Sequence, residues 1–175
     1  IEVLKEPFPE PLEEEPETPE HTKFQWMLVK IGILQSYDVW VAQNDRNKEY
    51  RGERLGDLSL REIPHFAGPE VLNVAKQIDV IWFKKRSAEP IRFFEVEHHT
   101  SIYSGLLRLN DVKVDYPINK GNIVGPKARK ALFERQIHRR TFNVSELEEV
   151  CDYLTYEDVE EWFEAQSKIK QFAHY

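Results

Sequence analysis

Three acidic residues lie inside apolar segments of the chain, where carboxylates are unusual. Asp79 is the second residue of IDVIWF (78–83), and Glu95 and Glu97 belong to IRFFEVEH (91–98). Both segments are short and rich in β-branched and aromatic residues, which favours buried strands. A carboxylate buried in a sheet is costly unless it is paired or binds a cation. These three residues therefore need a compensating partner.

The two segments are joined by the polar turn KKRSAEP (84–90), which predicts an antiparallel hairpin. If the turn is symmetric about Ser87, Asp79 faces Glu95, with Cβ atoms about 5 Å apart. Alternation along the second strand places Glu95 and Glu97 on the same face. The carboxylates would then share one site, whereas a one-residue slip in register would separate Asp79 from Glu95.

A pair of carboxylates at this spacing is suited to a hard cation. Mg²⁺ prefers oxygen ligands and is commonly held by one or two carboxylates together with water and substrate phosphate. Asp79 and Glu95 would supply that pair, and phosphodiester hydrolysis is the natural reaction of such a site. Ion pairs explain the acidic residues equally well, since Arg92, Arg108 or a lysine could neutralise them. The spacing alone leaves both interpretations open.

The segments before the hairpin are expected to include two helices and a strand. Apolar residues nearly all round a helical wheel predict a buried helix over 22–34, and YDVWVA predicts a strand over 37–42. Charged residues with glycine and proline in 43–68 indicate loops and one short helix. A second helix is predicted to start after Pro69 and to run to about Gln77.

The segments after the hairpin continue the alternation of helices and strands. A helix that packs on the sheet is predicted from its spaced apolar residues Ile102, Leu106 and Leu109. A short strand is expected at 122–124 and a basic helix at 127–139. The inward positions of the basic helix are predicted to be Ala128, Leu132 and Ile137. The order of elements predicts an α/β fold with a mixed β-sheet flanked by helices.

The two ends of the chain differ in composition from the middle. Residues 1–20 contain five prolines and eight glutamates, which predicts an acidic linker that does not fold independently. Residues 21–142 form the predicted core. Residues 143–175 contain nine acidic and two basic residues, and their pattern predicts an acidic helical C-terminal extension.

The net charge of −7 conceals a basic middle segment. Residues 21–142 carry 21 Lys and Arg against 14 Asp and Glu, a net of +7. Much of this charge falls on the predicted helix at 127–139, where it could face phosphates. The candidate nucleic-acid contacts are Lys127, Arg129, Lys130, Arg139 and Arg140. An ordinary solvated helix would explain the same run equally well.

The overall composition favours a folded cytoplasmic protein. Hydrophobic residues make up 41% and aromatic residues 12% of the chain, enough for a core. The single cysteine, Cys151, excludes an internal disulfide framework and favours a reducing compartment. No apolar run approaches the roughly 20 residues that cross a bilayer, and we expect no membrane partner. The chain begins without methionine, so it could be a segment of a longer protein.

Asp79 followed by an E-x-E strand resembles the metal-binding core of the PD-(D/E)xK nucleases, a superfamily that includes restriction enzymes. The resemblance extends through IDVIWF, FFEVEHHTSIYSGLLRL and NIVGPKARKALFERQIHRRTF, within residues 21–142. It implies a restriction-endonuclease-like fold in which Asp79, Glu95 and the Val96 carbonyl bind metal. Glu97 would take the position of the catalytic lysine.

Two positions depart from the motif of that superfamily. Ile78 replaces the proline, which is a common degeneracy, and Glu97 replaces the lysine. A lysine would orient or activate water and stabilise developing charge, whereas Glu97 could only bind metal or act as a base. Some restriction enzymes resemble this E-x-E variant, so the substitution permits activity without guaranteeing it.

Four further residues are candidates for accessory roles. Family members often place a polar residue of the first helix near the site, which selects Gln25, whereas His21 is expected at the surface. Glu70 could approach the metal, although acidic residues near a helix N-terminus usually serve the helix dipole. His99 could contact phosphate or metal, but an ordinary histidine at the end of a strand is the simpler interpretation. Arg108 could bind a phosphate or neutralise the acidic residues.

The leading hypothesis is an endonuclease that uses Mg²⁺ or Mn²⁺ to hydrolyse DNA in a restriction, defence or repair system. The alternative is a catalytically inactive nuclease-like module that binds DNA or a partner protein. A third class is a structural interaction module that uses the acidic C-terminal helix. A homodimer and a preceding domain of a longer chain are further partners to consider.

Overall fold

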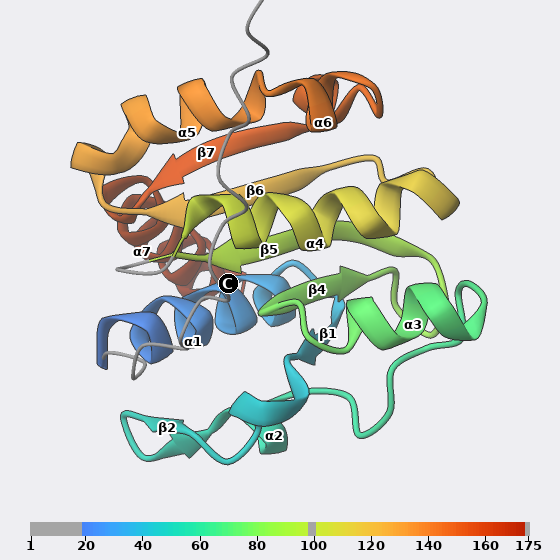
Figure 1. Ribbon diagram of the computed structural model, residues 1–175. Helices are drawn as coiled ribbons and strands as arrows, with labels where there is room; N and C mark the ends of the chain where they lie inside the picture. Colours follow the sequence, from blue (N-terminus) through green and yellow to red (C-terminus); the bar gives the residue numbers. More distant parts are fainter. Residues whose placement is uncertain (1–18, 98–100, 174–175) are drawn as a thin grey trace, which may run out of the picture.

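The computed structural model describes residues 19–97 and 101–173 (Figure 1). Its main sheet has five strands in the order β1-β4-β5-β6-β7. Their bounds are β1 (Asp38–Val41), β4 (Val80–Phe83), β5 (Pro90–Val96), β6 (Gly121–Gly125) and β7 (Cys151–Thr155). The pairs β1/β4 and β4/β5 are antiparallel, and β5/β6 and β6/β7 are parallel. The predicted α/β class, a restriction-endonuclease-like mixed sheet flanked by helices, is confirmed.

The β4–β5 hairpin has the predicted register over most of its length. Val80 pairs with Phe94 and Ile81 with Phe93, as a turn symmetric about Ser87 requires. The register shifts at Phe83, which pairs with Pro90. Because the shift lies at the turn end, the opposite end of the hairpin keeps the register that brings Asp79 beside Glu95.

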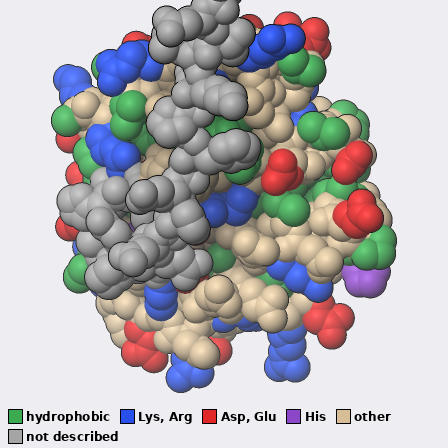
Figure 2. Space-filling model, in the orientation of Figure 1, with side chains coloured by type: hydrophobic (Ala, Val, Ile, Leu, Met, Phe, Trp, Pro, Cys, Tyr) green, Lys and Arg blue, Asp and Glu red, His purple; other side chains and the backbone are tan. Residues whose placement is uncertain are grey.

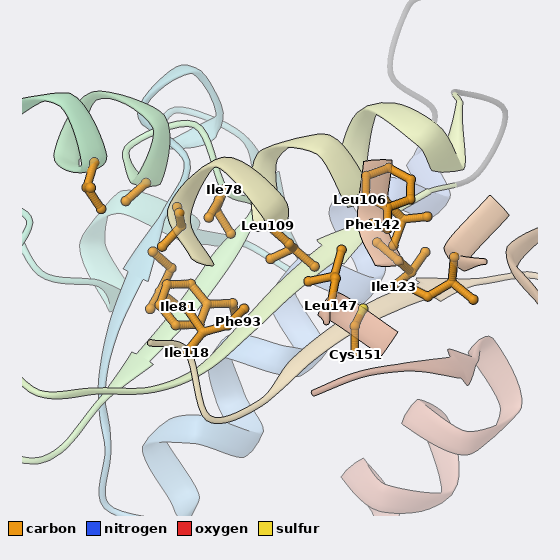
Figure 3. Packing of buried hydrophobic residues seen from close by; sticks show 14 of the residues in the cluster. Ile78, Ile81, Phe93, Leu106, Leu109, Ile118, Ile123, Phe142, Leu147 and Cys151 are labelled. Carbon is orange, nitrogen blue, oxygen red and sulfur yellow. The ribbon is translucent and has the colours of Figure 1, made fainter. Parts of the chain in front are cut away.

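One face of the sheet is covered by the helices that follow β1, β5 and β6. These are α3 (Pro69–Ala75), α4 (Ile102–Asp115), α5 (Lys130–Ile137) and α6 (Arg140–Asn143). Figure 1 shows α4 crossing in front of the sheet. Figure 3 shows the core beneath them, in which Leu106 and Leu109 of α4 belong to the same buried cluster as Phe93 of β5. The predicted inward positions of α4 are confirmed.

The opposite face is covered by α1 (Pro19–Leu34) and α7 (Tyr156–Phe172). Phe24 of α1 stacks on Tyr156 with ring centroids 3.7 Å apart, and Trp26 contacts Phe163. Their core includes Trp82 and other residues of the strands. The sheet is therefore buried on both faces, which explains why apolar residues occur at consecutive positions of β4 and β5.

The remaining described elements are short. They are η1 (Gln43–Asp45), β2 (Glu49–Tyr50), β3 (Glu53–Arg54), α2 (Leu55–Leu58), η2 (Lys127–Arg129) and η3 (Leu147–Glu149). The small β2–β3 sheet stands apart from the main sheet. The expectation for 43–68 of loops and one short helix missed this sheet, because two-residue strands leave almost no periodic pattern.

Three expectations about the ends of the chain and the basic run need correction. The predicted linker 1–20 lies mostly outside the described residues, and its last two residues already belong to α1, where Pro19 suits the first helical turn. The stretch beyond Phe142 is not wholly helical, because Cys151–Thr155 forms β7. Its alternation is short: Cys151 and Tyr153 are buried, and Asp152 is exposed.

The basic run at 127–139 is not one helix. It is divided into η2 and α5, and α6 begins at Arg140. Ala128 is exposed rather than inward, Leu132 is half-buried, and Phe133 supplies the buried contact beside Ile137. The short 3-10 turn after Pro126 rotates the following helix, so the wheel drawn over the whole run fails for its first residues.

No helix among the described residues is long and apolar enough to span a bilayer.

Candidate functional site

Asp79 lies directly before β4 and is buried, with 7% of its surface exposed. Its Oδ2 atom accepts a hydrogen bond of 2.6 Å from the Val96 backbone N–H and lies 3.4 Å from His21 Nε2. Burial raises the pKa of Asp79, but His21, Arg108 and the Val96 N–H outweigh it and lower that pKa. Asp79 is therefore a carboxylate held in its charged form.

Glu95 is completely buried and pairs with Arg108 of α4. Arg108 donates from Nε to Oε1 and from its terminal nitrogen to Oε2, both at 2.8 Å. Burial raises the pKa of Glu95 well above its ordinary value although Arg108 opposes this effect. Neighbouring Asp79 and Glu97 add repulsion in the same direction. The ion pair that the sequence left open as an alternative is thus formed.

Glu97 completes the acidic group and is 2% exposed. Its Oε1 atom lies 3.7 Å from the same Arg108 guanidinium. Helix α4 approaches closely here, because a Cβ atom built on Gly105 would lie 2.7 Å from Glu97 Oε1 and 3.2 Å from Glu95 Cβ. Glycine at position 105 lets Arg108, one helical turn later, reach both glutamates.

A second layer of polar groups comes from α1 and η1. Gln25 is fully buried and donates from Nε2 to Asp45 Oδ2 at 2.8 Å and to the Asp79 carbonyl at 3.3 Å. Lys48 pairs with Asp45 Oδ1 at 2.6 Å. Burial and repulsion from Asp79 raise the pKa of Asp45 to about 6. The structure therefore joins two further elements to the carboxylates of the hairpin.

His21 is buried, and the expectation of a surface position is wrong. It lies in the first turn of α1, on the face that packs on the sheet, and its Nε2 atom lies beside Asp79. Burial lowers the pKa of His21, but Asp79, Asp45 and Glu97 outweigh it and raise that pKa to about 9. The imidazole therefore carries a proton at neutral pH in the metal-free protein.

The cluster of His21, Asp45 and Asp79 fits a divalent metal ion. Each residue offers one ligand atom, and these atoms lie within 4.8 Å of one another. Two buried atoms beside them, Gln25 Oε1 and His21 Nδ1, have no hydrogen-bond partner among the described residues. A cation would satisfy the Gln25 Oε1 acceptor, since buried polar groups are normally paired. Its binding to His21 would require the imidazole to lose a proton. The donor set of carboxylates with one imidazole is a metal-binding set.

Three other predicted site residues are Glu70, His99 and Val96. Glu70 is exposed in the first turn of α3, and none of its described contacts reaches the carboxylates. His99 lies outside the described residues. The Val96 backbone N–H bonds to Asp79, and a role for its carbonyl stays a prediction.

The predicted DNA contacts lie on the short helices that follow β6. Lys127, Lys130, Arg139 and Arg140 are exposed and Arg129 is half-buried. The Arg139 guanidinium lies 4.8 Å from the centre of the Tyr103 ring. Figure 2 shows Lys and Arg side chains along the upper edge of the molecule, where α5 and α6 lie. Their role in binding DNA stays a prediction.

Asp45 was missed by the sequence analysis, and so was the inward position of His21. Asp45 lies in AQNDRNK, a polar stretch without periodicity, so no local pattern indicates that it is buried. For His21 the sequence carries no decisive signal, because it directly precedes the predicted helix over 22–34 and a histidine at a helix end can face either water or the core.

Comparisons with known proteins relate this chain to a restriction enzyme. The family model described as the type II restriction enzyme NmeDI C-terminal domain matches residues 6–174. The type II restriction enzyme NmeDI of Neisseria meningitidis serogroup C is 33% identical over 101 residues, which cover 53% of this chain and 28% of that protein. The match thus spans less than a third of the relative's length. No solved structure matches the chain. The chain belongs to the family of C-terminal domains typified by the type II restriction enzyme NmeDI.

Proposed function

We propose that this chain is the DNA-cleaving domain of a restriction enzyme and hydrolyses phosphodiester bonds with a divalent metal ion. The observation that carries the proposal is the buried acidic group at one end of the β4–β5 hairpin, where Asp79 meets Glu95 and Glu97. Membership of a restriction-enzyme family supports a nuclease, and the acidic group supplies residues suited to that reaction.

Asp79 is the residue best placed to hold the metal. It can share the ion with Asp45 and His21, or with Glu95 and the Val96 carbonyl as the resemblance to PD-(D/E)xK nucleases implies. When bound, a divalent ion polarises a phosphoryl oxygen and makes a bound water more acidic. An imidazole ligand favours a transition-metal ion such as Mn²⁺, whereas a purely carboxylate set suits Mg²⁺.

The protein side chains provide the remaining requirements of hydrolysis. Arg108 fixes the Glu95 carboxylate through two hydrogen bonds and places positive charge beside Glu97. We assign Glu97 as the group that accepts a proton from the attacking water, because it stands where a lysine would otherwise orient that water. Lys48 beside Asp45 and Arg108 beside Glu95 would supply the cationic charge that Glu97 cannot supply.

A second candidate is a module that binds DNA or a partner without cleaving it. The bidentate pair between Arg108 and Glu95 favours this alternative, because it neutralises Glu95 without any metal. A homodimer and a preceding domain stay predictions under either function.

Incubation of supercoiled plasmid with the purified protein separates the two functions. We expect nicked and linear DNA with Mn²⁺ or Mg²⁺ and intact plasmid with excess chelator. Intact plasmid with every divalent ion, at protein concentrations where a gel-shift shows binding, would establish the non-cleaving module.

A further inference from the structure

A basic cavity of about 410 Å³ opens beside the acidic cluster, between β1, η1, the end of α3 and the segment that leads from α2 to α3. The segment is tied to the edge strand by a hydrogen bond from the Leu60 N–H to the Val39 carbonyl. The residues of the cavity that matter for its chemistry are Trp40, Arg46, Arg61, Glu62, His65 and Lys76.

The wall of the cavity contains a buried donor that lacks an acceptor. Trp40 is 3% exposed, and its indole Nε1 has no hydrogen-bond partner in the described structure. An indole N–H only donates, so its missing partner must be an acceptor. Buried donors are normally satisfied, and Trp40 is one of the residues that line the cavity, so an acceptor atom bound there would be the nearest partner available to this N–H.

Arg46 is held in a fixed orientation against the same indole. Its guanidinium lies 5.1 Å from the centre of the Trp40 ring and donates to the Leu60 carbonyl at 2.8 Å. These partners are neutral, so they position the guanidinium without cancelling its charge. The cavity thus contains a pre-oriented cation.

The lining carries an excess of positive charge. Arg46, Arg61 and Lys76 are the basic side chains of the lining, and Glu62 is its acidic side chain. Neither Arg61 nor Lys76 forms an ion pair with a described carboxylate. An anion with several acceptor oxygens would complement both this charge and the orphan indole N–H.

The cavity is physically joined to the acidic cluster. Arg46 directly follows Asp45, so their Cα atoms are about 3.8 Å apart. The Gln43 N–H bonds to the Lys76 carbonyl at 3.0 Å, and the Ala42 N–H bonds to the Asp79 carbonyl at 3.2 Å. The turn at η1 therefore contributes Asp45 to the acidic cluster and Gln43 and Arg46 to the lining of the cavity.

We propose that this cavity binds a backbone phosphate of the DNA strand, adjacent to the phosphate that reaches the acidic cluster. The inference rests on the proposed function for the identity of the strand. Consecutive phosphates of one strand advance about 3.4 Å along the helix axis, so a phosphate one or a few nucleotides away meets the neighbouring cavity. The cavity fixes the register of the strand and carries no sequence preference.

The test is DNA binding measured as a function of salt, without catalytic metal, so that cleavage does not intervene. The variants are Arg61→Gln and Lys76→Gln, with Lys168→Gln on the exposed surface of α7 as the matched control. Each cavity variant should weaken binding equally for unrelated duplex sequences and lower the slope of log K against log salt by about 1. The control should keep the wild-type slope.

Two further measurements complete the test. Trp40→Phe keeps the ring but removes the donor, and it should weaken DNA binding with an unchanged salt slope. Inorganic phosphate should compete only at concentrations far above those of DNA. The proposal would be overturned if both cavity variants kept the wild-type slope of log K against log salt, or if Lys168→Gln lost as much DNA affinity as they do. Failure to cleave DNA with any metal would refute the nuclease while leaving these slopes as an independent result.

Discussion

Arg108 of α4 donates two hydrogen bonds of 2.8 Å to the fully buried carboxylate of Glu95 on β5. About a third of the Arg108 side chain remains exposed, whereas Glu95 has no access to water. The ion pair therefore extends from the protein surface at Arg108 to the buried site at Glu95. It satisfies Glu95 in the metal-free protein, which leaves Asp79 as the carboxylate most available to a cation.

Replacing Arg108 alone should destabilise the protein more than replacing both Arg108 and Glu95, the two members of the ion pair. Arg108→Ala leaves Glu95 buried and unpaired, which should lower the free energy of unfolding by about 3 kcal/mol. The double variant Arg108→Ala with Glu95→Gln should recover much of that loss, because it removes the uncompensated charge. Urea unfolding of the two single variants and the double variant measures the coupling. Additive losses would show that the two side chains act independently.

Gly105 should tolerate no side chain. A Cβ atom there would lie 2.7 Å from Glu97 Oε1, closer than real contacts allow, so Gly105→Ala must displace either the helix or the glutamate. We expect a loss of about 1–3 kcal/mol despite the better helix propensity of alanine. Ser104→Ala on the same helix is the matched control, and thermal unfolding with urea titration gives the comparison. Equal stability of Gly105→Ala and wild type would contradict the close approach of α4.

His21 should make the stability of the metal-free protein depend on pH. Its folded pKa of about 9 exceeds the ordinary value of 6.5, so its contribution is fully present below pH 6.5 and is lost as pH rises through 9. The contribution is on the order of 3 kcal/mol at its maximum. In urea titrations from pH 6 to 9.5, His21→Gln should lack this decline and the exposed His138→Gln should retain it. Parallel profiles for His21→Gln and wild type would refute the assignment.

The hairpin and its carboxylates could be predicted from sequence because their signals are local. Apolar strands, a polar turn and the position of Ser87 determine which residues face one another, and the Val80–Phe94 pair confirms that register. The helix at Ile102–Asp115 was equally clear because its apolar residues recur at one-turn spacing. Local periodicity thus identified the elements that position Asp79 and Glu95.

The partners of those carboxylates could not be predicted with the same certainty. Asp45 reaches the site through a 3-10 turn in a polar loop, and its burial depends on Gln25 and Asp79 from distant segments. The strand Cys151–Thr155 could not be recognised because it lies between acidic stretches, and two alternations of buried and exposed residues are too few to outweigh a helical pattern. A contact between two elements that lie far apart in the chain produces no pattern in the local sequence of either element.

Glu97 should be required for cleavage but not for binding. Glu97→Gln preserves shape and removes the base, so cleavage should fall by about 100-fold or more while DNA affinity without catalytic metal stays within a factor of two or so. Single-turnover cleavage and a filter-binding isotherm on the same preparation separate the effects. Unchanged cleavage would show that Glu97 takes no part in proton transfer.

The most direct test of the site is cleavage by Asp79→Asn. The asparagine oxygen can still accept the Val96 N–H, so the fold should persist, while the charge that holds the metal is removed. With Mn²⁺, plasmid cleavage should fall by at least about 100-fold relative to wild type. The exposed Asp57→Asn should cleave normally. Cleavage by folded Asp79→Asn at the wild-type rate would contradict a metal-dependent nuclease centred on Asp79.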